Sequence, residues 1–557
     1  MAKLMMLNKE RIKSVRDVVN KSFDPISEKV DMIADKIVSQ SLVSLVDPET
    51  VETKLFQPSV YQQAIFDYIS LLVRDKNVGH VGHVGQKHVV IEAVAGSGKT
   101  KTIEEATKLI PHNMSVCFLA FNRHIAEELK KRAPSNVRAM TLNSLGHNVV
   151  MSAMRANGKS VFLEPRKVYD VVSLLLKKEY SRFTQEEMDN IIPVVVRIVS
   201  LFKATRMTVS DSSLNYLMDR YNIFNEVDNN VLIQICAKVL YQCTRILERH
   251  ESSQIDFDDQ IWLPVQLNLP VFQYDFVFID ETQDLNAAQL ELALRACKKD
   301  GSIIAVGDRN QSIYGFRGAD VDAIPRIIKR LNAKVFPLSI TYRCPVKHVE
   351  LAKHFVPEIE AAPWAIEGEI IEIKDSDMEQ YVRAGDLAIC RTNAPLVSPC
   401  FALIKKGIKA TIRGRDIGEG LITLIKKIKG SSMDEFSIRL DTWASKEREK
   451  LEKKGASIES VMDKYETLLV LMEDCDDVDC LIAKIKTIFS DDVSAVIFSS
   501  VHRAKGLEAE TKDNSVYVLY PNLMPSQWAK KDWELIQERN LQYVAYTRAK
   551  NKMYMVW

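Results

Sequence analysis

The chain has 557 residues, more than one hydrophobic core usually organises, so several domains are expected. Lysine and arginine number 75 and aspartate and glutamate 74, for a formal net charge of +1. A nucleic-acid-binding face must therefore be locally basic, because the overall charge does not reveal one.

The composition also limits the cellular environment. No apolar run approaches the roughly 18 residues that span a bilayer, and the N-terminus lacks a secretory apolar segment. The nine cysteines include no C-x-x-C pair, which favours reduced thiols. We expect a cytoplasmic protein without a membrane partner.

Residues 1–55 are predicted to form a helical N-terminal extension. Val30, Ile33 and Ile37 fall on one face of such a helix. That face could pack against the rest of the chain or bind a partner, and the pattern leaves both open.

A phosphate-binding loop is predicted where an apolar strand, residues 88–92, meets a helix. Residues 93–100 read Ala-Val-Ala-Gly-Ser-Gly-Lys-Thr, with Ala93 where the usual pattern has its first glycine. The glycines let successive N–H groups converge on phosphate oxygens at a helix N-terminus. Lys99 would reach the β- and γ-phosphates and Thr100 would hold Mg²⁺. The segment predicts a nucleoside triphosphatase.

A second predicted strand, residues 276–279, ends in Asp-Glu-Thr-Gln-Asp at 280–284. The carboxyl end of a buried parallel strand is where ligands bind. There Asp280 would bind Mg²⁺ through water, and Glu281 would orient and deprotonate an attacking water. A solvated acidic turn is the alternative, which the accompanying phosphate loop disfavours.

Motif spacing predicts the domain organisation. Lys99 and Asp280 are 181 positions apart (280 − 99), too far for a few strand–helix units, so a helical insertion is expected at 150–258. It would divide a first lobe, residues 56–149 and 259–330. A second lobe is expected at 331–420 and 492–557, with strands at 334–338, 386–390, 494–498, 515–519 and 553–556. Alternating strands and helices predict an α/β fold with parallel sheets covered on both faces.

A short helical insertion is expected at 421–491 within the second lobe. Lys426, Lys427 and Lys429 lie near its start. They would contact DNA phosphates or form a solvated helix face, and the two interpretations are equally favoured.

Several segments in order resemble motifs of the UvrD/Rep branch of superfamily 1 DNA helicases. Asp-Glu-x-Gln-Asp at 280–284 and Gly-Asp-Arg-Asn-Gln within 306–319 carry the resemblance. Further matching segments lie at 58–62, 119–123, 141–146, 341–344, 500–508 and 543–549. The amino-acid sequences of segments 119–123 and 141–146 are most similar to those of F-box DNA helicase and phage-type members. The resemblance implies two RecA-like parallel-sheet motor lobes with inserted, mainly helical accessory domains.

The resemblance also implies roles in an ATP and Mg²⁺ site. Arg343 and Arg548 would be arginine fingers, and Gln311 would sense the γ-phosphate. Tyr342 would stack on adenine and Gln62 would bond its edge, while Glu508 would contact the nucleotide near its ribose and γ-phosphate. The implied catalytic set also contains Lys99 and Glu281. The loop residues expected to contact nucleotide are Ala95, Gly96, Ser97, Gly98, Lys99, Thr100 and Lys101.

For nucleic acid, the resemblance implies a single-strand track. Aromatic faces on which bases can stack are offered by Phe121, Tyr314 and Phe316. Contacts to phosphate or sugar are expected from Asn122, Thr141, Arg317 and His502. Burial of each aromatic side chain in a core is the alternative. Phe316 replaces a tryptophan that is usual in the family, and Asn143 replaces a histidine.

Three functions are compatible with these motifs. The first is an ATP-dependent 3′-to-5′ DNA helicase and translocase acting in repair, recombination or replication, with its polarity taken from the resemblance. The second is a translocase that strips proteins from single strands but separates duplex poorly. The third is a nucleotide-switched scaffold, which the complete set of catalytic residues disfavours. Expected partners are single-stranded DNA, single-strand/duplex junctions and a protein that loads the enzyme or increases its processivity.

Overall fold

The computed structural model describes residues 56–77, 85–248, 252–315, 323–430, 432–453, 457–473, 475–489, 495–509 and 511–557. The predicted extension, residues 1–55, lies outside the described residues. None of the helices in the described ranges is both long enough and apolar enough to cross a membrane.

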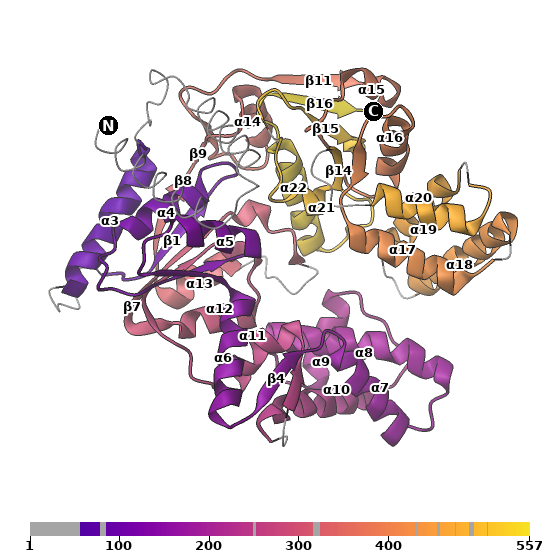
Figure 1. Cartoon of the computed structure of the whole chain (residues 1–557), viewed down its shortest axis with the longest axis horizontal. Coiled ribbons are helices and arrows are strands. Elements are labelled where there is room, and N and C mark those ends of the chain that lie inside the picture. Colours follow the sequence, from indigo (N-terminus) through magenta and orange to yellow (C-terminus); the bar gives the residue numbers. More distant parts are fainter. Residues whose placement is uncertain are drawn as a thin grey trace, which may run out of the picture. The chain divides into compact units, whose positions relative to one another are not determined.

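The first sheet, as far as the structure describes it, has six parallel strands in the order β3-β2-β6-β7-β1-β8 (Figure 1). The strands are β1 (Val89–Ala93), β2 (Val116–Ala120), β3 (Val137–Thr141), β6 (Tyr274–Ile279), β7 (Cys297–Gly307) and β8 (Lys334–Leu338). The strands predicted at 88–92 and 276–279 correspond to β1 and β6.

The position of β8 corrects one prediction. Residues 334–338 were expected to begin the second lobe, but Val89 of β1 lies beside Lys334 of β8 in parallel register. The sequence of a strand indicates that it is extended but does not indicate which strand pairs with it. Residues 334–338 were therefore assigned to the wrong sheet. The predicted lobe boundary at 331 therefore cuts through the first sheet.

Helices cover both faces of the first sheet because alternate strand residues point to opposite faces. Val89 and Ile91 pack with one helix group, whereas Val90 packs with the other. The first group is α3 (Val60–Asn77), α4 (Lys99–Lys108) and α5 (Arg123–Arg132). The second is α6 (Leu142–Ala156), α11 (Phe257–Gln266), α12 (Ala287–Arg295) and α13 (Ala323–Leu331).

The inserted region has a hydrophobic core of its own. Its elements are β4 (Ser160–Leu163), α7 (Lys167–Glu179), α8 (Gln185–Thr205), α9 (Asp211–Arg220), α10 (Asn229–Thr244) and β5 (Ser252–Ile255). Buried Lys203 pairs with Asp256 at 2.9 Å and with Asp259 at 2.8 Å, which ties α8 to the start of α11. Helix α6 crosses the predicted boundary at residue 150, so the insertion continues a helix of the first lobe.

The second sheet, within the described residues, also has six parallel strands, in the order β11-β16-β15-β12-β14-β13. They are β11 (Glu369–Ile373), β12 (Leu387–Cys390), β13 (Ala410–Ile412), β14 (Val496–Ser500), β15 (Val516–Leu519) and β16 (Lys552–Val556). Two short strands, β9 (Ile340–Thr341) and β10 (Glu360–Ala361), pair separately.

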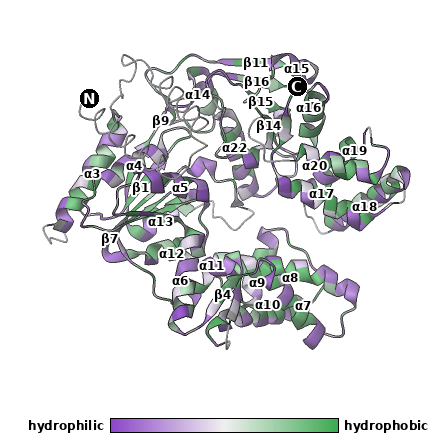
Figure 2. Ribbon diagram, in the orientation of Figure 1, coloured by the Kyte–Doolittle hydropathy of each residue, from purple (hydrophilic) through white to green (hydrophobic). Residues whose placement is uncertain are grey.

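The helices of the second lobe are α14 (Val346–Ala352), α15 (Met378–Tyr381), α16 (Ala394–Lys405), α17 (Arg415–Ile428), α18 (Met433–Lys453), α19 (Glu459–Met472), α20 (Val478–Ile488), α21 (Val501–Ala504) and α22 (Asp532–Tyr546). Helices α17–α20 occupy most of the predicted insertion at 421–491. Phe436 of α18 and Leu468 of α19 join the same buried core as Phe498 of β14. In Figure 2 these helices alternate between apolar and polar colouring, as expected for helices with one buried face.

Candidate functional site

The predicted phosphate loop lies between β1 and α4 at the carboxyl edge of the first sheet. Gly96 and Gly98 have φ of 71° and 75°, which favour glycine. A Cβ on Gly96 would lie 2.6 Å from Arg343 Cβ and from Thr341 Oγ1, and Gly96 O accepts a 2.9 Å hydrogen bond from Tyr342 N–H. The loop is therefore held against the segment that carries two predicted nucleotide contacts.

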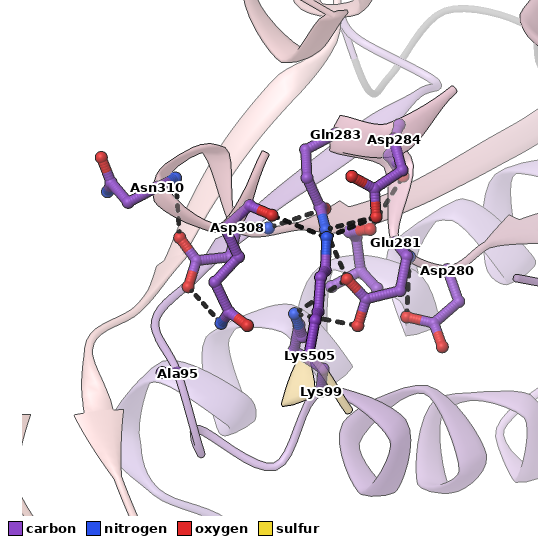
Figure 3. A network of polar contacts seen from close by, with 12 residues as sticks. Ala95, Lys99, Asp280, Glu281, Gln283, Asp284, Asp308, Asn310 and Lys505 are labelled. Atoms are coloured by element: carbon purple, nitrogen blue, oxygen red, sulfur yellow. Dashed lines mark hydrogen bonds and ion pairs between the residues drawn. The ribbon is translucent and has the colours of Figure 1, made fainter. Parts of the chain in front are cut away.

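Beside the loop, Glu281 follows β6 and forms an ion pair with Lys99 at 3.2 Å (Figure 3). Burial opposes ionisation of Glu281, but the ammonium groups of Lys99 and Lys505 lower its pKa to about 2. Its φ of 49° places a non-glycine residue in the left-handed region. Backbone strain of this kind concentrates at functional sites. The structure thus brings together the predicted lysine and the predicted catalytic carboxylate.

Asp280, the predicted Mg²⁺ ligand, is 3% exposed at the same edge. Burial and the neighbouring Glu281 charge raise the pKa of Asp280 to about 7. One carboxylate oxygen accepts the Glu281 N–H at 2.9 Å. In the described residues, no three His, Cys, Asp or Glu side chains are grouped to hold a metal. Asp280 and Thr100 are the residues that would hold Mg²⁺, an ion that usually keeps several waters and binds substrate phosphates.

Gln311 lies in the short turn η3 (Arg309–Gln311), and its side chain donates to Asp308 at 2.7 Å. Lys505, from the second lobe, forms an ion pair with Asp284 and donates to the Gln311 carbonyl at 2.6 Å. Lys505 lies in the matching segment 500–508, but no role was predicted for it, because a lysine's partner in a distant segment leaves no local signal. It joins the two lobes at this site.

The two predicted arginine fingers come from the second lobe. Arg343 forms an ion pair with Glu508, which also pairs with Lys550 at 2.8 Å. Arg548 is 1% exposed and donates to the carbonyls of Val544 and Leu507 at 2.8 and 3.1 Å. Burial and the Arg343 charge lower the pKa of Arg548 to about 10.

The predicted adenine contacts lie next to the loop. Gln62 lies in α3 and is 1% exposed. Its Nε2 donates to Thr102 Oγ1 at 2.9 Å, and its Oε1 accepts a hydrogen bond from Tyr342 Oη at 3.5 Å. The Tyr342 ring stacks with Trp364 at 5.9 Å between centroids. Gln62 and Tyr342 are thus brought together as the resemblance implied.

These groups border one cleft of about 690 Å³. Its lining includes Gly96, Ser97, Gly98, Lys99, Thr100, Lys101, Phe121, Asn122, Glu281, Gln311, Tyr314, Tyr342, Arg343, Lys505, Glu508, Arg548 and Lys550. Ser97 Oγ and Arg343 Nε are buried donors, and neither has a hydrogen-bond partner within the described part of the chain. Unused donors at a glycine-rich loop fit an anionic ligand such as a triphosphate.

Two loop residues have contacts that the prediction did not include. The Ala95 N–H donates to the hydroxyl of Tyr543, a buried residue of α22, at 2.8 Å. Lys101 pairs with Glu105 of its own helix at 2.7 Å. Tyr543 lies in the matching segment 543–549, but no role was predicted for it; in the structure it supports the loop from the second lobe.

Among the predicted nucleic-acid contacts, Phe121 and Tyr314 stack at 6.2 Å between ring centroids with 14° between ring planes. Phe121 is 43% exposed, so its face is accessible to solvent. Tyr314 Oη donates to the His502 carbonyl at 3.2 Å, which connects both lobes. These aromatic side chains lie at the cleft, between the nucleotide loop and His502.

Asn122 and Thr141 have local structural roles in addition to any contact with a strand. Asn122 caps α5 by accepting the Ile125 N–H at 2.9 Å, and Thr141 caps α6 by accepting the Ser144 N–H at 3.1 Å. Phe316 and Arg317 lie outside the described residues. All four remain predicted DNA contacts.

Part of the chain is similar to a known protein family. Residues 75–332 match the family model of the UvrD/REP helicase N-terminal domain. Over this range the chain is similar to the UvrD/Rep helicases. Two of the predicted family features, a phosphate loop and an acidic segment after β6, lie within the matched range.

Several UvrD/Rep-like relatives match at low identity. F-box DNA helicase protein 1 of Schizosaccharomyces pombe is 22% identical over 83% of this chain and 55% of its own length. A probable DNA helicase II homolog of Rickettsia conorii is 25% identical over 48% of this chain and 42% of its own. ATP-dependent DNA helicase PcrA of Staphylococcus epidermidis is 25% identical over 42% of this chain and 33% of its own length. The chain spans about half or less of the length of these relatives.

Proposed function

We propose that this protein is an ATP-dependent DNA helicase and translocase that moves 3′ to 5′ on single-stranded DNA. The observation that carries the proposal is the cleft in which Lys99 and Glu281 of the first lobe face Arg343 and Arg548 of the second. Ligands from two lobes allow nucleotide turnover to change the distance between them. The names of the relatives also support this activity.

In the structure, Lys99 forms an ion pair with Glu281 at 3.2 Å. A triphosphate in the loop would offer Lys99 a stronger anionic partner, so the Glu281 carboxylate would be released to orient and deprotonate water. Mg²⁺, held by Thr100 and Asp280, would neutralise charge on the β- and γ-phosphates. Lys99 thus switches from restraining Glu281 to binding substrate.

Arg343 is the group that most directly couples substrate to lobe closure. It pairs with Glu508 of its own lobe, and its Nε lacks a partner. Developing negative charge on a γ-phosphate would attract Arg343 and Arg548, while Gln311 would exchange its bond to Asp308 for one to phosphate. Closure would then strain the Lys505 bridge to Asp284.

For the track, Phe121 and Tyr314 would stack on bases, and His502 would contact the strand beside them. Single-stranded DNA and single-strand/duplex junctions are the proposed substrates. The 3′-to-5′ polarity, a role in repair, recombination or replication, and a loading partner follow from family resemblance.

The deciding experiment measures ATP hydrolysis with and without single-stranded DNA. The proposal expects stimulation by DNA, and displacement of streptavidin from the 5′ but not the 3′ end of a biotinylated strand. Equal hydrolysis with and without DNA would favour a nucleotide-switched scaffold. Displacement of streptavidin from the 3′ end would show the opposite polarity, and the proposal of a translocase would still hold.

A second candidate, a translocase that strips proteins but unwinds little, is favoured by one observation. Helices α17–α20 share a buried core with the second sheet and so form no separate body that could grip duplex. Efficient protein displacement together with poor strand separation would select this candidate.

A further inference from the structure

A second cavity, the Trp528 pocket, lies away from the nucleotide cleft and has a volume of about 430 Å³. Arg197, Tyr221 and Asn222 of the first insertion line one side. The second lobe supplies the rest: Arg391, Leu451, Ser457, Glu459, Ser460, His502, Ser526, Trp528, Ala529, Trp533, Glu534, Gln537 and Glu538. Its volume is in the range of small-molecule sites.

The Trp528 pocket adjoins the proposed DNA track. His502 lines it and also lines a neighbouring groove of about 790 Å³ that contains Tyr314. The Tyr314 hydroxyl bonds the His502 carbonyl. A strand that stacks on Tyr314 and passes His502 therefore reaches the pocket next.

Charged groups in the Trp528 pocket are largely paired with one another. Arg391 donates to Glu538 from both Nε and Nη2 and to Glu459 at 3.1 Å. The same glutamates accept from the N–H and hydroxyl of Ser526 at 2.9 and 2.7 Å. Because Arg391 is paired with two carboxylates, this part of the pocket does not favour binding of a phosphate.

What remains for a ligand is aromatic surface and two uncommitted polar atoms. Trp528 and Trp533 are half-buried, and Tyr221 faces the same cavity. Trp533 Nε1 and Gln537 Oε1 are buried and have no hydrogen-bond partner among the residues that the structure describes. They are one donor and one acceptor, the combination that matches the edge of a nucleobase. A flat, neutral ring with polar edges fits this chemistry better than an anion.

We propose that the Trp528 pocket binds one nucleobase of the single strand, stacked on Trp528. The inference rests on the proposed DNA-binding function and adds a contact that the sequence motifs did not identify. Because Tyr221 and Trp528 come from different parts of the chain, the bound base links the first insertion to the second lobe. Asn222 already donates to Glu534 across this boundary at 3.2 Å.

The test uses the full chain and 3′-tailed duplexes in which a single abasic site is moved one position at a time along the tail. The junction fixes the register, and affinity is measured without ATP. The wild-type protein should show positions where loss of the base weakens binding, one of which depends on Trp528. Stacking on one aromatic side chain contributes about 5- to 150-fold in affinity.

Trp528→Phe and Trp528→Leu form the matched pair, because both shorten the side chain but only phenylalanine keeps an aromatic face. Stacking predicts that Trp528→Phe retains sensitivity at that position and Trp528→Leu loses it. Trp557→Leu, at an exposed tryptophan outside the pocket, should keep the wild-type profile. Identical profiles for Trp528→Phe and Trp528→Leu would overturn the inference. If wild-type hydrolysis is not stimulated by DNA, the proposed function itself fails.

Discussion

Glu281 and Lys99 form one ion pair but should fail differently when substituted. Glu281→Gln removes the base and leaves Lys99 free for phosphate, so nucleotide binding should persist while turnover falls by about 10²-fold or more. Lys99→Ala should lose binding. Fluorescent-nucleotide titration and single-turnover hydrolysis separate the two effects. Glu128→Gln, which changes a partly exposed carboxylate paired with Arg132 on α5 outside the cleft, is the control and should hydrolyse normally.

His88, just before β1, gives stability a dependence on pH. Burial, aided by Lys87 and Lys76, lowers the pKa of His88 to about 4. In the unfolded chain the His88 imidazole has a pKa of about 6.5, so it takes up a proton at a higher pH than it does in the folded protein. The folded state is therefore most stable above pH 6.5, and it loses stability as the pH falls from 6.5 toward 4. The folded protein should therefore be measurably less stable at pH 5 than at pH 7.

Chemical denaturation at pH 7 and pH 5 measures this loss. His88 Nδ1 accepts the Ile303 N–H at 3.1 Å. His88→Asn keeps an acceptor but cannot titrate, so its stability should fall less between the two pH values. An equal fall in both proteins would assign the pH dependence to other groups.

Individual side chains show where sequence analysis stops. The local patterns around Lys99 and Glu281 predicted that these two residues meet at a phosphate site, and the family resemblance implied that Arg343 joins them. Tyr543 also belongs to a segment that resembles the family, 543–549, but nothing local in the sequence indicates that its hydroxyl accepts the Ala95 N–H 448 positions away. Trp528 likewise acquires its surroundings only when distant segments meet.

Helices α6 and α11 approach most closely at Gly146. A Cβ there would lie 1.9 Å from the Gln260 carbonyl oxygen, a backbone atom that cannot move aside alone. Gly146→Ala should therefore destabilise the protein by about 1–3 kcal/mol or more through overpacking.

Thermal denaturation checks this prediction against Gly420→Ala. Gly420 lies within α17, and a Cβ there meets nothing within 4 Å. Alanine at Gly420 should be neutral or stabilise by up to about 1 kcal/mol, because it favours the helix. A melting temperature unchanged by Gly146→Ala would mean that the helices separate at little cost.

The positions of many strands and helices were predictable from the sequence, whereas the strands with which each strand pairs were less predictable. Apolar runs and turn residues located β1, β6, β12 and β15 to within a residue or two. Hydrophobic spacing also indicated the helical character of α7–α10. Pairing partners are set by contacts across the chain, which explains why β8 was assigned to the second lobe. The extension of α6 into the insertion was missed because a continuous helix carries no boundary signal at residue 150.

Across both lobes, the nucleotide cleft and the proposed track share side chains. Tyr314 lines the cleft and the groove that leads to His502, and Lys505 Nζ lies 5.1 Å from the Tyr314 ring centroid. Lys505 also contacts Asp284 and the Gln311 carbonyl. A change at the γ-phosphate position therefore has a short physical route to the strand, through Gln311, Lys505 and Tyr314.

The packing of α17–α20 limits what this coupling can accomplish on duplex DNA. Leu440 of α18 and Leu481 of α20 are fully buried in the core that also contains Cys390 of β12. Rotating these helices as a body would expose that core, at about 25 cal/mol for each Å² of apolar surface. We therefore expect a monomer to translocate well on single strands but to unwind long duplex weakly unless a partner or additional motors assist.

Single-turnover experiments compare the two activities in one preparation. Translocation on single strands of increasing length is measured beside separation of a long 3′-tailed duplex, with a trap that prevents rebinding. The expected result is a translocation time that grows with strand length, together with duplex yields that fall steeply beyond short lengths. Raising protein concentration before the trap should restore unwinding, since several motors then share one strand. Processive unwinding by an isolated monomer would show that α17–α20, despite their shared core, provide the duplex grip.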